Sequence, residues 1–278
     1  MHRSKVLVGV GAVALVVVGI GLYLTLRANA RPVTVEEARA RTTTTAATDD
    51  GSGGAGDPAD GSDAADAVRR PEPGIYRYEG TGTEALSTPP LSQTQGPEMP
   101  ATVEWLDEGC WSLRIDYSSN HWQRWRYCPT GDDLTETGGE TWQRWMIGTT
   151  AITNLSTFRC DESVTMAADP EPGQEWEQRC TGTGEAVEGE TVSEGPHRFE
   201  GEEVVDVDGE AVLTRRYVSE RAMSGAQTGT ERTTSWFDAG TGLPVRNERV
   251  LEVRTDTPIG ESTYTETGEF HLIDLQPA

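Results

Sequence analysis

The residues of this chain that are best suited to bind a small molecule belong to a repeated tetrapeptide. The sequence WQRW occurs at residues 122–125 and again at residues 142–145. Tryptophan offers a large apolar surface and arginine pairs with anions, so the two copies together suit a ligand with apolar and anionic parts. We predict a ligand-binding site formed by Trp122, Arg124, Trp125, Trp142, Arg144 and Trp145.

The spacing within each tetrapeptide also permits a purely structural interpretation. Side chains alternate between the two faces of a β-strand, so tryptophans at positions i and i+3 point to opposite faces. Each copy would then place one ring inside the fold and one outside. Packing in the core and between neighbouring strands accounts for such rings without a ligand. Exposed tryptophans beside arginine would favour binding, and full burial would favour the structural interpretation.

Motifs of catalysis and metal binding are absent from the sequence. It contains no HExxH, no GxSxG elbow, no P-loop and no dinucleotide fingerprint. Residues 206–209 (DVDG) superficially resemble a calcium loop, but they lack the further acidic ligands, and we predict a type I′ turn there. The sequence therefore predicts a protein that is not an enzyme and that uses no metal and no cofactor.

The four cysteines predict two disulfide bonds. Cys110 and Cys128 are equidistant from Ser119, and Cys160 and Cys180 are equidistant from Pro170. If a β-hairpin folds at each midpoint, the two cysteines of each pair lie opposite each other at a distance that suits a disulfide. We predict the bonds Cys110–Cys128 and Cys160–Cys180, which require an oxidising compartment. A zinc site or a redox pair is disfavoured because the spacings are wide and no CxxC occurs.

The segments that must position these residues have the pattern of β-strands. From Pro73 onward, short alternating stretches rich in Val, Thr, Trp and Tyr are separated by glycine-containing turn signals. We expect turns at Gly131-Asp132, Gly138-Gly139 and Asp208-Gly209, and hairpin tips at residues 80–82 and 182–184. We predict an all-β domain over residues 73–278, built as a long antiparallel meander of about ten to fourteen strands.

A membrane anchor is predicted ahead of this domain. Residues 6–26 carry no charge, and at 1.5 Å per residue they span about 30 Å, the thickness of a hydrocarbon core. Arg3 and Lys5 keep the tail 1–5 in the cytoplasm by the positive-inside rule, so the domain is extracytoplasmic. Cleavage after Ala30 in the sequence Ala28-Asn29-Ala30 is an alternative that would leave the domain outside without its tether.

Residues 27–72 are predicted to connect the anchor to the domain. Residues 34–37 (TVEE) form a capping box that opens a short juxtamembrane helix through Arg41. From Thr42 to about Arg70 the composition is that of a disordered acidic linker. The formal charge of the chain is −23, which repels phosphate backbones and disfavours nucleic acid as a partner.

Residues 236–246 (WFDAGTGLPVR) resemble the W-x-D-x-x-T-G-L-P-x-R strand–turn–strand motif of the LolA-like superfamily of lipoprotein and lipid carriers and sigma-factor regulators. The motif residues in this chain are Trp236, Asp238, Gly242, Leu243, Pro244 and Arg246. The resemblance implies a curved half-barrel sheet whose concave apolar face, usually plugged by helices, holds acyl chains or peptide. The chain also resembles uncharacterised membrane-anchored exported proteins of high-GC Gram-positive bacteria, with which it shares residues 73–76 (PGIY). It departs from the carriers because it has no lipobox and no convincing plug helices.

These features predict a non-enzymatic binding module that is tethered to the cell membrane by one helix. Its expected partner is an apolar, lipid-like ligand or an envelope protein. The alternative is a structural or sensory ectodomain that acts through surface protein contacts, with a hydrolase as a distant third. An open concave face would favour ligand binding, and a filled sheet interface would favour the alternative.

Overall fold

Almost all of the described chain belongs to one antiparallel β-sheet. The computed structural model describes residues 30–48, 70–257 and 260–278. Fourteen strands form the sheet, and the helices within these ranges are α2 and the short 3₁₀ helix η1. The elements in chain order are α2 (Val35–Thr48), β1 (Gly74–Tyr76), β2 (Tyr78–Leu86), β3 (Leu91–Gln95), β4 (Ala101–Trp105), η1 (Asp107–Gly109), β5 (Trp111–Ser118), β6 (His121–Thr130), β7 (Asp133–Ile147), β8 (Thr150–Met166), β9 (Glu175–Gly184), β10 (Val187–Val207), β11 (Glu210–Gly225), β12 (Gln227–Asp238), β13 (Pro244–Thr257) and β14 (Gly260–Leu272).

The sheet is a meander that returns to its own beginning. Each strand from β4 to β13 pairs with the next strand in the chain. The last strand, β14, then pairs with β2, β2 pairs with β3, and β1 pairs with β4 at the opposite edge. The sheet therefore ends at β1 and β3 and stays open. The prediction of an all-β domain built as a long antiparallel meander is confirmed.

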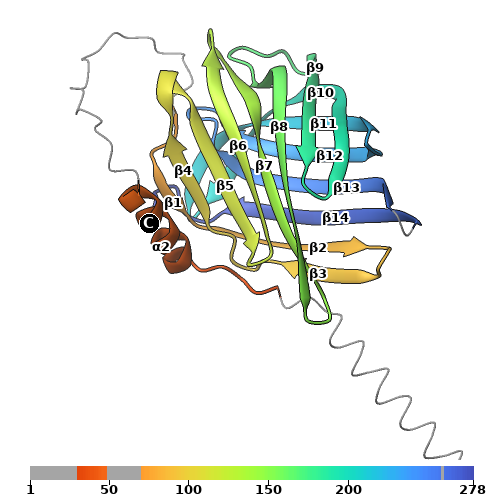
Figure 1. Ribbon diagram of the computed structural model, residues 1–278. Helices are drawn as coiled ribbons and strands as arrows, with labels where there is room; N and C mark the ends of the chain where they lie inside the picture. Colours follow the sequence, from red (N-terminus) through yellow and green to blue (C-terminus); the bar gives the residue numbers. More distant parts are fainter. Residues whose placement is uncertain (1–29, 49–69, 258–259) are drawn as a thin grey trace, which may run out of the picture.

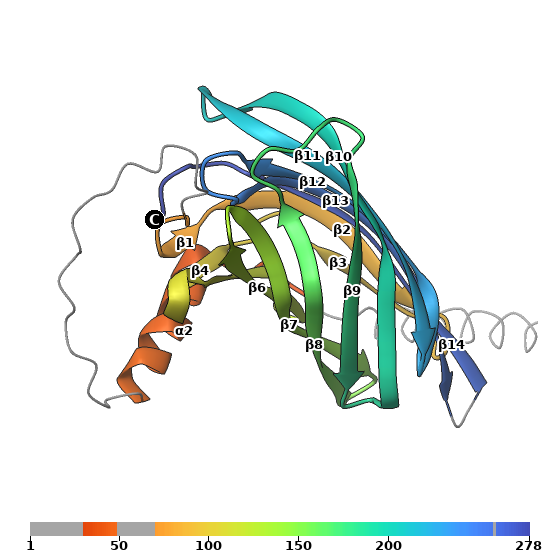
Figure 2. The ribbon, with the colours of Figure 1, turned by 90° about the horizontal axis from the view of Figure 1, so that it is seen from above.

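The sheet is strongly curved, so that two groups of strands face each other. Figure 2 shows it as an arch, and in Figure 1 the strands β4–β9 lie across the strands β11–β14, β2 and β3, while β10 runs beside β9 and joins the two groups. We call these groups the first wall and the second wall. The walls approach at one corner, where the backbone nitrogen of Gly96, just after β3, donates to the carbonyl oxygen of Tyr117 in β5 at 2.8 Å.

An aromatic core joins the two walls. The ring of Tyr78 meets the ring of Phe270 edge-on at 5.5 Å between centroids, and Tyr117 lies 6.3 Å from the same phenylalanine. The hydroxyl group of Tyr78 donates to the carbonyl oxygen of Pro244 at 2.7 Å, which satisfies a polar atom that would otherwise be buried without a partner. The core therefore secures the curvature by contacts between residues that are far apart in the sequence.

Both predicted disulfides are present. Cys110 is bonded to Cys128, and Cys160 is bonded to Cys180, with Cα–Cα distances of 4.1 and 4.0 Å. The hairpin of β5 and β6 has the predicted register, in which Trp111 pairs with Tyr127. Because paired cysteines persist in oxidising compartments, the two bonds indicate an extracytoplasmic location.

The glycines serve two different purposes, which the sequence did not distinguish. Gly131 and Asp208-Gly209 lie in turns as predicted, and the positive φ angles of Asp208 (51°) and Gly209 (82°) match a type I′ turn. The expected turn at Gly138-Gly139 is wrong, because both residues lie inside β7, and the expected hairpin tip at residues 80–82 is wrong, because it lies inside β2. A Cβ atom on Gly139 would lie 1.9 Å from the carbonyl oxygen of Arg124, so close backbone approach explains this glycine.

The capping box that the sequence predicts is formed at the start of α2. The backbone nitrogen of Glu37 donates to Oγ1 of Thr34, and the backbone nitrogen of Thr34 donates to the Glu37 carboxylate, both at 3.3 Å. The helix continues past the predicted end at Arg41 to Thr48 and so occupies part of the predicted linker. It is docked on the sheet, since the Arg41 guanidinium lies 2.9 Å from the carboxylate of Asp116.

Within the described ranges, no helix has the length and the apolar character needed to cross a membrane. The predicted membrane span, residues 6–26, lies outside the described residues, as do residues 49–69 of the predicted linker.

Candidate functional site

The concave face of the sheet contains a cavity of about 700 Å³. The cavity is lined by residues of both walls. Alternate residues of a strand point to the same face, so those that point to the concave side form most of the lining. Aromatic and aliphatic side chains form a large part of the lining. They include Leu86, Trp125, Trp145, Phe158, Leu251 and Val253.

Glycines in the first wall leave room for the aromatic rings. Gly139 of β7 pairs with Trp125 on one side and with Phe158 on the other. A Cβ atom on Gly139 would lie 2.8 Å from Cζ of Phe158, closer than carbon atoms approach without a shift. Gly182 of β9 is the other cross-strand neighbour of Phe158. The ring of Phe158 therefore lies in a gap between two residues without side chains, at the surface of the cavity.

The two WQRW tetrapeptides are divided between the faces of the sheet. Trp125 and Trp145 line the cavity, whereas Trp122 and Trp142 pair with each other and, by alternation, face the convex side. Arg124 also faces the convex side, where it lies 3.7 Å from the Glu140 carboxylate. The strand alternation that the sequence predicts is thus confirmed. The six proposed ligand contacts do not form one surface, and Arg144 has the same strand parity as Trp142.

The glutamines of the tetrapeptides reach the concave face instead of the arginines. Gln143 donates through Nε2 to the hydroxyl group of Tyr264 at 2.7 Å and to Oε2 of Glu84 at 3.1 Å. Gln123 accepts at 2.8 Å from Nη1 of Arg249. Both contacts connect the first wall to the second. The repeated tetrapeptide therefore supplies one ring to the cavity and one amide that joins the walls in each copy.

Two buried carboxylates form the centre of a polar network between the walls. Glu84 of β2 is 1% exposed and Glu266 of β14 is 3% exposed. Nδ1 of His121, from the first wall, lies 3.3 Å from Oε1 of Glu84. Gln95 donates to Oε1 of Glu266 at 3.1 Å. The hydroxyl group of Tyr264 lies 3.0 Å from Glu84 and 2.7 Å from Glu266, so it bridges the two carboxylates.

The charges of this network stabilise one another. Burial by itself would lower the pKa of His121, but the nearby carboxylate of Glu84 and that of Glu266 raise it above its usual value. Burial would raise the pKa of Glu266, but Arg249 and His121 bring it below its usual value. Arg249 also pairs through Nε with Glu231 at 2.8 Å. The network is therefore a set of mutually compensated buried charges.

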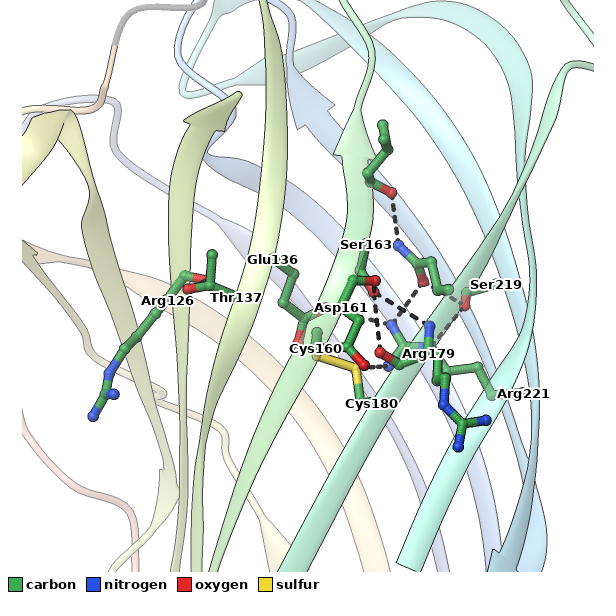
Figure 3. Close-up of a disulfide and its surroundings, with 12 residues drawn as sticks. Arg126, Glu136, Thr137, Cys160, Asp161, Ser163, Arg179, Cys180, Ser219 and Arg221 are labelled. Atoms are coloured by element: carbon green, nitrogen blue, oxygen red, sulfur yellow. Dashed lines mark hydrogen bonds and ion pairs between the residues drawn. A yellow bond between two sulfur atoms is a disulfide. The ribbon is translucent and has the colours of Figure 1, made fainter. Parts of the chain in front are cut away.

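A second polar cluster surrounds the disulfide that faces the cavity (Figure 3). Arg221 of β11 donates to Oε1 of Gln178 at 2.8 Å and lies 3.4 Å from the carboxylate of Glu136. Its Nη1 is 3.7 Å from Sγ of Cys180. Burial raises the pKa of Glu136, and Arg221 only partly opposes this shift. Glu136 lies within 4.8 Å of Cys160 and Cys180, but their sulfur atoms are bonded to each other and offer no thiolate to a metal.

His197 lies in the wall of the cavity beside the aromatic core. Its ring stacks on Tyr217, with 4.8 Å between the ring centroids. Nε2 lies 3.0 Å from the carbonyl oxygen of Thr165, which can only accept, so Nε2 carries the proton. Burial lowers the pKa of His197 to about 4, which makes the ring neutral at pH 7. Nδ1 is therefore an acceptor, and it has no partner among the described residues.

Residues 236–246 form the strand–turn–strand that the sequence predicts. β12 ends at Asp238 and β13 begins at Pro244. The Asp238 carboxylate accepts from the backbone nitrogen of Gly240 at 3.0 Å and from the Thr241 hydroxyl at 2.6 Å, which holds the turn. Gly242 has a φ of 73°, which favours glycine. Leu243, 4% exposed, belongs to the core.

The first and last residues of this motif, Trp236 and Arg246, lie outside the cavity. Trp236 donates through Nε1 to the carboxylate of Glu203 at 2.9 Å. The guanidinium of Arg246, its cross-strand neighbour, lies 4.8 Å from the centroid of the indole ring. These contacts give the motif a local structural role in this chain.

Sequence reasoning missed the residues of the polar network and His197. A signal was present in residues 91–95 (LSQTQ), where alternation places Gln93 and Gln95 on the same face as Leu91, and all three are buried. A buried glutamine needs a partner, so this pattern indicates a polar group in the interior. Glu84 and Glu266 give no comparable signal, because the chain is rich in exposed acidic residues.

Comparison with known proteins does not assign the chain to a family. No family model matches it, and no curated protein matches it. Among solved structures, the chain is similar to the hypothetical lipoprotein YmcC from Escherichia coli (K12). The two share 14% sequence identity with a TM-score of 0.29, and the similarity covers 68% of this chain and 86% of that chain. A likeness at this level carries no argument about function.

Proposed function

We propose that this protein is a non-enzymatic binding module, tethered to the membrane by residues 6–26, that takes up an apolar, lipid-like ligand on the extracytoplasmic side. The observation that carries the proposal is the cavity of about 700 Å³ on the concave face. Pockets for small molecules span about 300–1,000 Å³ and are lined mainly by apolar and aromatic side chains. A purely structural ectodomain would have no need of such a cavity.

The construction of the cavity supports binding over structural packing. In a filled interface, large side chains from the two walls would meet. Here Gly139 and Gly182 contribute no side chains on either side of Phe158, and the ring of Phe158 lies at the surface of the cavity. Ile152 lines the cavity and remains 46% exposed, so the cavity has an apolar margin that a ligand can cover.

The buried pair of Glu84 and His121 does not favour a reaction. Glu84 and His121 form an ion pair, but their side chains are only 0% and 1% exposed, and neither belongs to the lining of the cavity. A general base must be within hydrogen-bond reach of its substrate. The pair is better explained as part of the connection between the walls.

Photoactivated labelling of the full chain in phosphatidylcholine nanodiscs tests the proposal. A long-chain alkyl probe that carries a diazirine is expected to label peptides of the concave face, such as residues 141–158. The substitution Ile152→Glu places a charge at the margin of the cavity and is expected to reduce this labelling severalfold. Val250→Glu is the matched control, because Val250 is 57% exposed on the opposite face of β13 from the lining residues Leu251 and Arg249. Equal labelling of both variants and the unchanged protein would contradict the proposal.

A further inference from the structure

The end of the cavity near the core contains polar atoms without partners. Nδ1 of His197 and Oγ1 of Thr165 are buried and lack a hydrogen-bond partner among the described residues. Both residues line the cavity, with 5% and 4% exposure, and they contact each other through the bond from Nε2 to the Thr165 carbonyl oxygen. Buried polar atoms in native proteins are almost always paired, so two unpartnered atoms on neighbouring residues of a cavity wall indicate a missing partner.

The chemistry of the two atoms defines what can complete them. Nδ1 of His197 is an acceptor, because Nε2 holds the proton of the neutral ring, so the partner must donate. Oγ1 of Thr165 can donate or accept. A hydroxyl group donates and accepts, and it therefore suits both atoms. A carboxylate or a phosphodiester accepts only, and it would face the lone pair of Nδ1.

The charged groups of the cavity wall also disfavour an anion. Arg221 is paired with Glu136, and Arg249 is paired with Glu231 and Glu266. The lining thus has three carboxylates for two guanidinium groups, and each guanidinium is already engaged. An anionic head group would have to break one of these buried pairs. An ammonium group would donate to Nδ1, but it would lie near Arg221, whose charge already acts on His197.

We propose that His197 and Thr165 form a subsite for the hydroxyl end of an uncharged amphiphile, whose alkyl part occupies the apolar region of the cavity. This inference rests on the proposed function and specifies the class of ligand. It differs from the ligand that the WQRW arginines suggested, since Arg124 faces the convex side and takes no part in the cavity.

Head-group specificity is the measurement that separates this inference from the proposed function. The full chain in phosphatidylcholine nanodiscs is labelled with three diazirine probes of the same alkyl length that end in an alcohol, a carboxylate or an amine. We expect the alcohol to label the concave face about fivefold more than the carboxylate, the factor that corresponds to one neutral hydrogen bond. Equal labelling by all probes, or preference for the carboxylate or the amine, would overturn the inference and leave the proposed function standing. If no probe labelled the concave face, the proposed function itself would be contradicted.

The substitution Thr165→Val tests the subsite without endangering the fold. Valine matches the shape of threonine and removes a hydroxyl group that has no partner among the described residues, so stability should be unchanged or slightly higher. The preference for the alcohol over the carboxylate should fall by about fivefold. The matched control is Ser193→Ala, which also removes an unpartnered buried hydroxyl group from the lining, but about 13 Å along β10 from His197. An unchanged preference in Thr165→Val, or an equal loss in both variants, would show that the subsite is assigned wrongly.

Discussion

His121 and His197 are both buried in this sheet, yet their surroundings drive them toward opposite charge states. The carboxylate of Glu84 lies 3.3 Å from His121 and raises its pKa. Among the described residues, no carboxylate raises the pKa of His197, and burial lowers it to about 4. A histidine in a strand therefore gives no indication of its charge until the residues across the fold from it are known.

The neutral state of His197 predicts a loss of stability in acid. Its pKa is about 4 in the folded protein and 6.5 as the unperturbed value, so only the unfolded chain gains the proton as the pH falls through this window. The contribution is fully present above pH 6.5 and declines progressively toward pH 4, by at most roughly 3 kcal/mol. We expect the substitution His197→Gln, whose amide can still donate to the Thr165 carbonyl oxygen, to flatten this part of the pH profile.

Urea unfolding at several pH values measures the effect on the free energy of unfolding. The control is His271→Gln, since His271 is an exposed histidine of another strand of the sheet, β14. Carboxylates of the protein also titrate in this pH range. The effect of His197 is therefore measured as the difference between the pH profiles of the two variants. A His197→Gln profile with the same slope as the control profile would show that His197 is protonated in the folded protein.

At the scale of elements, α2 is a short polar helix. It is held by the capping box at its N-terminus and by its contacts with the sheet. Its first turn carries the acidic residues Glu36 and Glu37, and no basic residue lies in its last turn. The residues before the helix are also attached to the sheet, because the backbone nitrogen of Ser119 donates to the carbonyl oxygen of Arg31 at 2.8 Å. The helix is therefore positioned by the hairpin of β5 and β6.

Loss of the capping residue should loosen this helix. Substitution of Thr34 by alanine removes the acceptor of the Glu37 backbone nitrogen and is expected to cost about 1 kcal/mol of local stability. Hydrogen–deuterium exchange of residues 35–48 should become faster, while exchange in the sheet stays the same. Thr34→Ser keeps the hydroxyl group and should exchange like the unchanged protein. If Thr34→Ala exchanged at the original rate, docking alone would be sufficient to hold the helix.

At the scale of the whole molecule, the two disulfides close loops of nearly equal size but lie on different faces. The sequence separations are 18 and 20 residues, so constraint of the unfolded chain predicts about 3 kcal/mol for each bond. Cys180 is 4% exposed and contacts Arg221 inside the cavity, whereas Cys110 and Cys128 lie on the opposite face. Removal of the inner bond therefore also disturbs a packed polar cluster.

We expect the double substitution of Cys160 and Cys180 by alanine to destabilise the protein more than the double substitution of Cys110 and Cys128. The difference is measured from urea midpoints of the two variants and the unchanged protein, all under non-reducing conditions. Mass spectrometry of non-reduced peptides provides the check on the pairing. Equal losses would show that the polar cluster of Arg221 tolerates the change, and four free thiols in the unchanged protein would contradict both bonds.

Much of the local architecture was predictable from the sequence. The pairing of Cys110 with Cys128 follows from symmetry about Ser119, and the turn at Asp208-Gly209 follows from its residue types. The capping box at Thr34 is a contact over three residues. Each of these features depends on neighbours within one hairpin or one helical turn, where residue type and spacing define the geometry.

The cavity and its polar network depended on the tertiary structure. Gln123 and Arg249 are separated by 126 residues and meet only because the meander curves back on itself. The glycines were ambiguous for the same reason, since a glycine that permits a turn and one that permits close approach of strands look alike in the sequence. Strand alternation predicted that each tetrapeptide would divide its tryptophans between two faces. Which face would be concave, and which side chains from the opposite wall would meet it, was decided by the curvature of the whole sheet.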